Sequence, residues 1–193
     1  MTKRMAFNTL GFTIIELLVG MLITGILAMM AFRFFNVTNQ QAVTQVEISE
    51  MQQGNRACLD EICTALRSAG FGLSSPPAYL ISGDSLSLFS RRDSVAIDTV
   101  SYFLAEFTET EYAERISGDI GGTKYHKLMK KVNSANADIF ADNITDLRYT
   151  PISSNLIAVT LEVQTTKRDP NYQDNNGFRT FINTERAVLR NVK

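Results

Sequence analysis

The chain has 193 residues, of which 45% are hydrophobic and 20% are charged, and its formal net charge is −1. This length suits one domain, with room for an appendage. A charge balance so close to zero gives no support for a protein that binds nucleic acid through its bulk charge. The apolar residues are spread unevenly along the chain, and their positions are more informative than their total.

The first feature in chain order is an apolar run from Phe12 to Phe32, in which Glu16 is the only charged residue. As a helix this run would be about 30 Å long, which matches the hydrocarbon core of a bilayer. A secretory signal peptide has a shorter apolar region, of about 7–15 residues, followed by a cleavage site with small residues. The sequence therefore predicts a retained membrane helix.

The orientation of this helix follows from the charges beside it. Lys3 and Arg4 precede the run, whereas Arg33 alone follows it before Arg56. Positive residues near a membrane helix favour the cytoplasmic side. We therefore expect the N-terminus in the cytoplasm and the rest of the chain outside.

Helical character continues beyond the membrane, because no proline occurs from Asn36 to Ala69 and apolar residues recur at helical spacing. Gly54 should weaken this helix by about 1 kcal/mol relative to alanine without ending it. Gly70 and Gly72 are a C-terminal signal. We predict one helix from about Thr13 to Ala69. Its outer half carries an apolar stripe that needs a cover, made of Leu59, Ile62, Cys63 and Leu66.

Two cysteines, Cys58 and Cys63, fall within this predicted helix. An oxidising compartment would permit a disulfide. On a regular helix, however, residues at this spacing have Cα atoms roughly 8–9 Å apart, and bridged pairs normally need less than about 7 Å. We therefore interpret both cysteines as small packing residues.

The remainder of the chain is predicted to form strands. The clearest is Leu156–Thr166, where apolar and polar residues alternate as in a half-buried antiparallel strand. In Val95–Leu104 the alternation changes phase, which suggests a bulge. Ala135–Ala141 is predicted to be a short helix, and Lys167–Gly177 a solvated loop. The other predicted strands are Ser85–Ser90, Lys127–Val132, Asn143–Ile152 and Phe178–Val192. The expected fold class is α+β, one long helix on an antiparallel sheet of about four to six strands.

The N-terminus resembles the processing site of type IV prepilins and of type II secretion pseudopilins. The residues that carry this resemblance are Lys3-Arg4 and the stretch Gly-Phe-Thr-Ile-Ile-Glu-Leu-Leu-Val from Gly11 to Val19. The resemblance implies a pilin-like fold and cleavage by a membrane aspartyl peptidase between Gly11 and Phe12. It also implies methylation of the new amine on Phe12 and a role for Glu16 in assembly.

Physical chemistry adds to the role that the resemblance implies for Glu16. A carboxylate at the centre of a membrane helix costs on the order of 3 kcal/mol or more. Two opposite charges 4 Å apart attract by about 4 kcal/mol at an effective dielectric of 20. The amine that cleavage creates on Phe12 would therefore offset the cost. The pair forms within one chain, or between chains, where it would set the axial register of a fibre.

A second resemblance covers more of the chain. The stretches Gln52–Ala57 and Leu66–Gly72 are similar to the helix end of PilW-type minor pilins, and Val100–Tyr102, Ala141–Leu147 and Ala187–Asn191 are similar to their later pattern. The J-type pseudopilins of type II secretion share that plan. Both cysteines lie in the predicted helix, so the disulfide-closed C-terminal loop typical of many major pilins is missing. This favours a minor subunit.

Sites for other chemistry are not evident in the sequence. The one histidine, His126, stands among lysines and is interpreted as a surface residue. No paired-histidine or Cys-x-x-Cys arrangement indicates zinc, and the oxygen-rich stretch Asp169–Gly177 does not match the common calcium loop. We expect no catalytic residues, no cofactor and no metal, and we do not expect an enzyme. The lysines near His126 are Lys124, Lys127, Lys130 and Lys131, and they are weak support for DNA binding.

The leading hypothesis is a minor type IV pilin that takes part in pilus assembly or initiation. The alternatives are a J-type pseudopilin of a type II secretion system and a tip-located module that binds a surface, DNA or a sugar. The expected partners are prepilin peptidase, other pilins, the inner-membrane assembly platform and membrane lipid, with nucleic acid not expected. The chain would first be a single-pass inner-membrane protein with a periplasmic domain and would then enter a fibre. The expected segments are residues 1–11 as leader, 12–32 as membrane and fibre-core helix, 33–70 as its outer half, and 71–193 as the β-rich domain.

Overall fold

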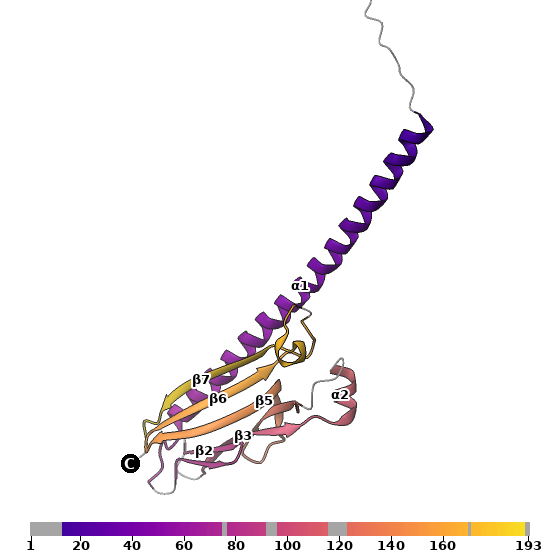
Figure 1. The fold of residues 1–193 in the computed structure, drawn as a ribbon. Helices are drawn as coiled ribbons and strands as arrows, with labels where there is room; N and C mark the ends of the chain where they lie inside the picture. Colours follow the sequence, from indigo (N-terminus) through magenta and orange to yellow (C-terminus); the bar gives the residue numbers. More distant parts are fainter. Residues whose placement is uncertain (1–12, 75–76, 92–95, 116–122, 170, 192–193) are drawn as a thin grey trace, which may run out of the picture. The chain divides into compact units, whose positions relative to one another are not determined.

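The computed structural model describes residues 13–74, 77–91, 96–115, 123–169 and 171–191. The chain divides into two compact units, one up to Val43 and one from Thr44 onward. The elements follow one another as α1 (Ile14–Ser68), β1 (Tyr79–Ser82), β2 (Ser85–Ser90), β3 (Asp98–Glu106), α2 (Glu109–Arg115), β4 (His126–Val132), β5 (Asp138–Ser153), β6 (Leu156–Gln164), the 3-10 turn η1 (Asp174–Gly177) and β7 (Thr180–Val188) (Figure 1).

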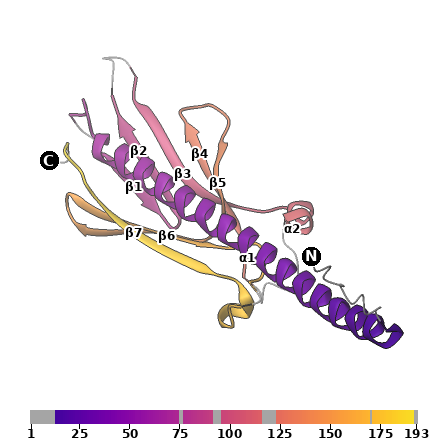
Figure 2. The same cartoon turned by 90° about the horizontal axis from the view of Figure 1, so that it is seen from above.

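The described strands form one antiparallel sheet in the order β1-β2-β3-β4-β5-β6-β7, so every strand pairs with its neighbours in sequence. In the unit from Thr44 onward, α1 crosses one face of this sheet (Figure 2). The predicted α+β class, a long helix with an antiparallel sheet, is confirmed. The expectation of four to six strands is wrong, because the sheet has seven.

Helix α1 runs from Ile14 to Ser68, within one residue of the predicted helix at each end. Gly70, two residues beyond the last residue of the helix, has a φ of 80°. A Cβ at this position would lie 2.8 Å from the carbonyl oxygen of Asn191, so a larger residue would clash as well as be strained. The Gly70 N–H donates a hydrogen bond of 2.8 Å to the Phe89 carbonyl and so ties the helix end to β2.

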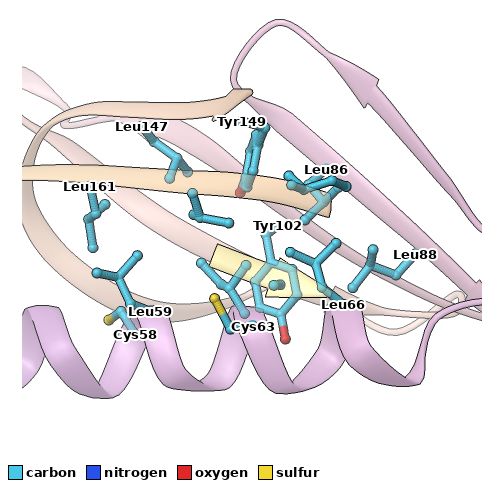
Figure 3. Packing of buried hydrophobic residues seen from close by; sticks show 14 of the residues in the cluster. Cys58, Leu59, Cys63, Leu66, Leu86, Leu88, Tyr102, Leu147, Tyr149 and Leu161 are labelled. Atoms are coloured by element: carbon cyan, nitrogen blue, oxygen red, sulfur yellow. The ribbon is translucent and has the colours of Figure 1, made fainter. Parts of the chain in front are cut away.

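The core is a single cluster between the second part of α1 and the sheet (Figure 3). The predicted stripe of Leu59, Ile62, Cys63 and Leu66 is buried, with exposed fractions of 0–3%. From β6, Ile157, Val159, Leu161 and Val163 are all buried, as their alternation predicts. The sheet therefore covers the apolar stripe of α1, as the sequence predicts.

Both cysteines are free and buried, which confirms their interpretation as packing residues. Burial is the main reason why the pKa of the Cys58 thiol is raised to about 11. Burial likewise raises the pKa of Cys63 to about 11. Thiols with pKa values this high are poor nucleophiles at neutral pH because little thiolate is present.

Two further local predictions are wrong. Ala135–Ala141 is not a helix, because β5 begins at Asp138 and continues the β4 hairpin after a turn that contains Asn133 with a φ of 52°. The bulge expected in Val95–Leu104 is also absent from the described part of β3. That strand begins at Asp98 and pairs in regular register with β2 and β4, so the phase change precedes the strand.

The register shifts lie instead on β5, where Asp142 and Asn143 stand opposite the single residue Lys127. Asn143 has a φ of 61°, and asparagine tolerates this left-handed region better than most residues. The sequence pattern also missed β1, whose four residues are too few to show an alternation.

Replacement of Leu66 by alanine should lower the free energy of unfolding by about 2–5 kcal/mol, because the side chain is fully buried and its loss leaves a cavity. Urea unfolding of the full-length protein in detergent can be followed by tyrosine fluorescence, since all six tyrosines follow Thr44 and the chain has no tryptophan. The control is Leu80→Ala on β1, where the side chain is 56% exposed. Equal losses for the two variants would contradict the assigned core.

Candidate processing and assembly segment

The predicted cleavage residues Gly11 and Phe12 lie outside the described residues, so their role stays a prediction. The description begins at Thr13, which precedes the first turn of α1. The Glu16 N–H donates to Thr13 Oγ1 at 3.3 Å, and Thr13 Oγ1 donates to Glu16 Oε2 at 3.4 Å. A threonine followed three residues later by glutamate is the sequence pattern of a capping box, and the bond from the Glu16 N–H to the threonine hydroxyl is one of the two bonds of that motif, so Thr13 caps the helix.

The part of α1 that follows Glu16 exposes large apolar side chains. Met21, Leu22, Phe32 and Phe34 are among those more than 60% exposed. The most apolar 18-residue window of α1 has a mean hydropathy of 2.3 and no buried residue. Among the described residues, α1 is the one helix long and apolar enough to cross a membrane. An apolar surface this large requires lipid or other apolar helices around it.

Small residues interrupt this apolar surface. A Cβ at Gly20 or at Gly25 would meet no atom of this chain within 4 Å. The Thr24 hydroxyl is satisfied within the helix, because it donates a hydrogen bond of 2.8 Å to the Gly20 carbonyl. Small residues on membrane helices let neighbouring helices approach closely. This part of α1 is therefore suited to pack against other apolar helices.

Two of the four lysines around His126 are paired within the fold, whereas Lys124 and Lys131 are exposed. Lys127 forms an ion pair with Glu111. Lys130 lies 2.6 Å from Glu61 and over the rings of Tyr102 and Phe140. These two charges are therefore neutralised within the fold. The spacing of residues in the sequence does not predict either ion pair.

His126 is half-buried on β4, and its Nδ1 is buried without a hydrogen-bond partner among the described residues. His126 is therefore partly at the surface, as interpreted, but its Nδ1 is inside the fold. Within the described ranges, no group of three or more histidine, cysteine, aspartate or glutamate side chains is placed to hold a metal ion.

The loop Lys167–Gly177 is anchored in the fold at Asp169, which is 6% exposed. Its Oδ1 accepts a hydrogen bond from the Asn171 N–H at 2.9 Å, and Oδ2 lies 2.7 Å from both Nε and Nη2 of Arg179. The Asn171 N–H is the main cause that lowers the pKa of Asp169, and Arg179 lowers it further, against the opposing effect of burial. The prediction of a solvated loop therefore misses this internal ion pair.

The comparisons with known proteins bear on the N-terminus. Residues 7–32 match the family model described as the prokaryotic N-terminal methylation motif. No curated protein and no solved structure gives a match to the chain. The motif, the exposed apolar helix and the antiparallel sheet together define a pilin-like precursor.

The matched motif supports a type IV pilin-like or pseudopilin precursor. It is the motif of structural pilin and pseudopilin subunits. The motif implies processing by prepilin peptidase and assembly with other pilins. It is also consistent with anchoring in a membrane through α1.

Replacement of Asp169 by asparagine should destabilise the domain at pH 7, because the ion pair to Arg179 is lost. The folded-state pKa of Asp169 lies below the unfolded value of about 3.9, so its contribution is present above that pH and is lost as the pH falls through the folded pKa. The difference between variant and wild type in urea unfolding should therefore shrink below about pH 4. Asp174→Asn in the same loop is the control, since Asp174 is exposed. A difference that is constant between pH 7 and pH 3 would contradict this account.

Proposed function

We propose that the protein is a minor type IV pilin, processed by prepilin peptidase and incorporated as a structural subunit during pilus assembly or initiation. The observation that carries the proposal is the N-terminal methylation motif, which leads directly into an exposed apolar helix. The apolar part of α1 would enter the membrane first and the fibre core later. The unit from Thr44 onward would then face the outside of the fibre.

In this proposal Gly11 and Phe12 flank the cleaved bond, and the new amine on Phe12 is methylated. Glu16 would pair with such an amine on its own chain or on a neighbouring one. Pairing between chains would fix the axial register with which one helix packs beside the next. The exposed position of Glu16 in the first turn of α1 supports this role, because nothing described in the fold covers it.

The minor-subunit assignment is supported by the cysteines. Both are free and buried on α1, so the chain does not close a C-terminal loop with them as many major pilins do. The tip-binding alternative loses part of its support, because Lys127 and Lys130 of the four lysines near His126 are paired with glutamates inside the fold. The other two, Lys124 and Lys131, are exposed, and Lys124 pairs with Glu106.

The localisation that we propose follows from the charges beside the helix. Lys3 and Arg4 would keep the N-terminus in the cytoplasm, and the sheet domain would lie in the periplasm before assembly. A J-type pseudopilin of a type II secretion system would have the same topology. The two are distinguished by the proteins that co-purify with the chain, either a pilus motor with pilins or the components of a secretion system.

Processing predicts a defined N-terminus. Mass spectrometry of the chain from cells that contain prepilin peptidase should find methylated Phe12 as the first residue. In cells without the peptidase, the chain should keep its leader. A chain that begins at Met1 in peptidase-competent cells would rule out the processing step.

Replacement of Glu16 by glutamine should leave cleavage at Gly11 intact but reduce the amount of the chain in sheared fibres at least tenfold. An attraction of about 4 kcal/mol between the amine and the carboxylate is large enough for such an effect. The matched control is Glu109→Gln in α2, which is exposed and lies far along the chain. Unchanged incorporation of the Glu16 variant would exclude the pairing as a requirement for assembly.

A further inference from the structure

A groove lies within the unit from Thr44 onward, apart from the N-terminal motif. Its volume is about 340 Å³, and it is lined by residues of α1, β5 and β6. The lining residues that matter for its chemistry are Glu47, Glu50, Gly54 and Asn55 on α1, Asp142 on β5 and Val163 on β6. The groove is mostly apolar, with a few polar groups, as in sites that bind another molecule.

Asn55 is a polar residue that lines the groove. Its side chain is 2% exposed, and neither Oδ1 nor Nδ2 has a hydrogen-bond partner within the part of the chain that the structure describes. Buried amides are almost always paired, since an unpaired one forfeits the hydrogen bonds it made to water. A carboxamide both accepts and donates hydrogen bonds, and a peptide group offers the complementary C=O and N–H. The orphaned amide therefore points to a polypeptide occupant.

Gly54, next to Asn55, is a second and independent observation. It lies in the interior of α1, where glycine is less favourable than alanine. A Cβ at Gly54 would meet no atom within 4 Å, and its φ is not in the left-handed region. Neither packing nor backbone conformation within this chain therefore requires a glycine. The remaining use of a glycine here is to let another chain approach the helix closely.

The charged residues at the groove indicate that its occupant is positively charged. The described residues that line it include three carboxylates and no lysine or arginine. Glu47 is already engaged, because its Oε1 accepts hydrogen bonds from the Thr166 N–H at 2.9 Å and from the Thr166 hydroxyl at 3.0 Å. Glu50 is exposed and has no ion-pair partner among the described residues. A positively charged group beside Glu50 would complement this rim.

The wall opposite α1 is shaped by the bulge of β5. Asp142 and Asn143 occupy the place of one residue there, and both line the groove. Bulges commonly redirect side chains at functional sites. The groove is thus formed by a local irregularity of the sheet on one side and by a glycine on the other.

We propose that this groove is a docking site for a basic peptide segment of a neighbouring subunit of the fibre. A peptide group of that segment lies against Gly54 and pairs with the Asn55 amide once the side chains that cover this amide move aside, and a lysine or arginine beside it faces Glu50. The proposal rests on the proposed function, since it assumes that the chain assembles with other subunits. In this proposal, the unit from Thr44 onward contacts a neighbouring subunit separately from the packing of the N-terminal helices.

The first test fills the groove with a larger side chain. It uses the full-length chain in cells that assemble the chain into fibres. Gly54→Phe should reduce the recovery of neighbouring subunits with the chain at least tenfold, because the ring occupies the space of the segment. Gly54→Ala, with a much smaller side chain, should retain recovery and fold stability. Urea unfolding followed by tyrosine fluorescence checks that Gly54→Phe is folded. Recovery of neighbouring subunits by a folded Gly54→Phe variant at the wild-type level would overturn the proposal.

The second test identifies the occupant with the photo-crosslinking residue benzoylphenylalanine in place of Ala57, which is exposed and lines the groove. The expected adduct joins this position to a peptide of a neighbouring subunit that contains lysine or arginine. Glu50→Lys should lower its yield at least tenfold, and Glu50→Gln by less. The same residue in place of Gln53, which is exposed but outside the groove, is the control. An adduct with lipid alone, with a peptide that lacks a basic residue, or with the same partner peptide from both positions would overturn the proposal.

The failure of this proposal is distinguishable from the failure of the proposed function. If the chain begins at methylated Phe12 and enters fibres, but Gly54→Phe has no effect, the groove proposal alone is wrong. If the chain keeps its leader and enters no fibre, the proposed function is wrong, and the groove proposal falls with it.

Discussion

Leu59, Ile62, Cys63 and Leu66 are almost completely buried, whereas the large apolar residues between Ile14 and Val37 are 48–83% exposed. One continuous element, α1, therefore meets two kinds of surroundings. From Thr44 onward the sheet provides an apolar cover for its stripe. Before that point, no described residue covers the apolar side chains. Burial at about 25 cal/mol per Å² of apolar surface stabilises the first arrangement within the chain, and it would favour transfer of the earlier part of α1 into lipid.

The polar groups of the second unit are arranged around this apolar contact. Glu61 extends from α1 to Lys130 of β4, so an ion pair accompanies the packing of helix on sheet. Glu47, nearer the start of the unit, accepts hydrogen bonds from the segment after β6. Asp169 and Arg179 then hold the following loop. Partly buried charges need such partners, because their loss of water would otherwise oppose folding.

Sequence reasoning succeeded where a pattern was long or specific. The limits of α1 were predicted to within one residue because its apolar stripe is regular and its end is marked by glycines. The strand β2 was predicted with its observed bounds, since its leucines alternate with serines. The motif at residues 7–32 was recognised from local spacing alone.

The sequence failed where structure depends on contacts between distant residues. Ala135–Ala141 has no strand pattern, and only pairing with β4 and β6 makes β5 as long as it is. Lys130 and Glu61 are far apart in the sequence, so their ion pair cannot be read from spacing. The orphaned amide of Asn55 is also invisible in a sequence, because burial and the absence of a partner are properties of the fold. For Gly54, the residue beside it, the sequence predicts only that it destabilises the helix.

The competing explanations of Glu16 can be weighed by magnitude. Its contacts with Thr13 are half of a capping box, since the Glu16 N–H donates to the threonine hydroxyl at 3.3 Å, whereas the carboxylate accepts from that hydroxyl at 3.4 Å and not from the Thr13 N–H. A helix cap contributes about 1 kcal/mol, and the threonine hydroxyl supplies an acceptor without a carboxylate nearby. A charged carboxylate costs on the order of 3 kcal/mol at the bilayer centre, and less near the interface, where the first turn of a membrane helix lies. In the proposed function, an attraction of about 4 kcal/mol to a new N-terminal amine would exceed this cost, and cleavage would then be linked to assembly.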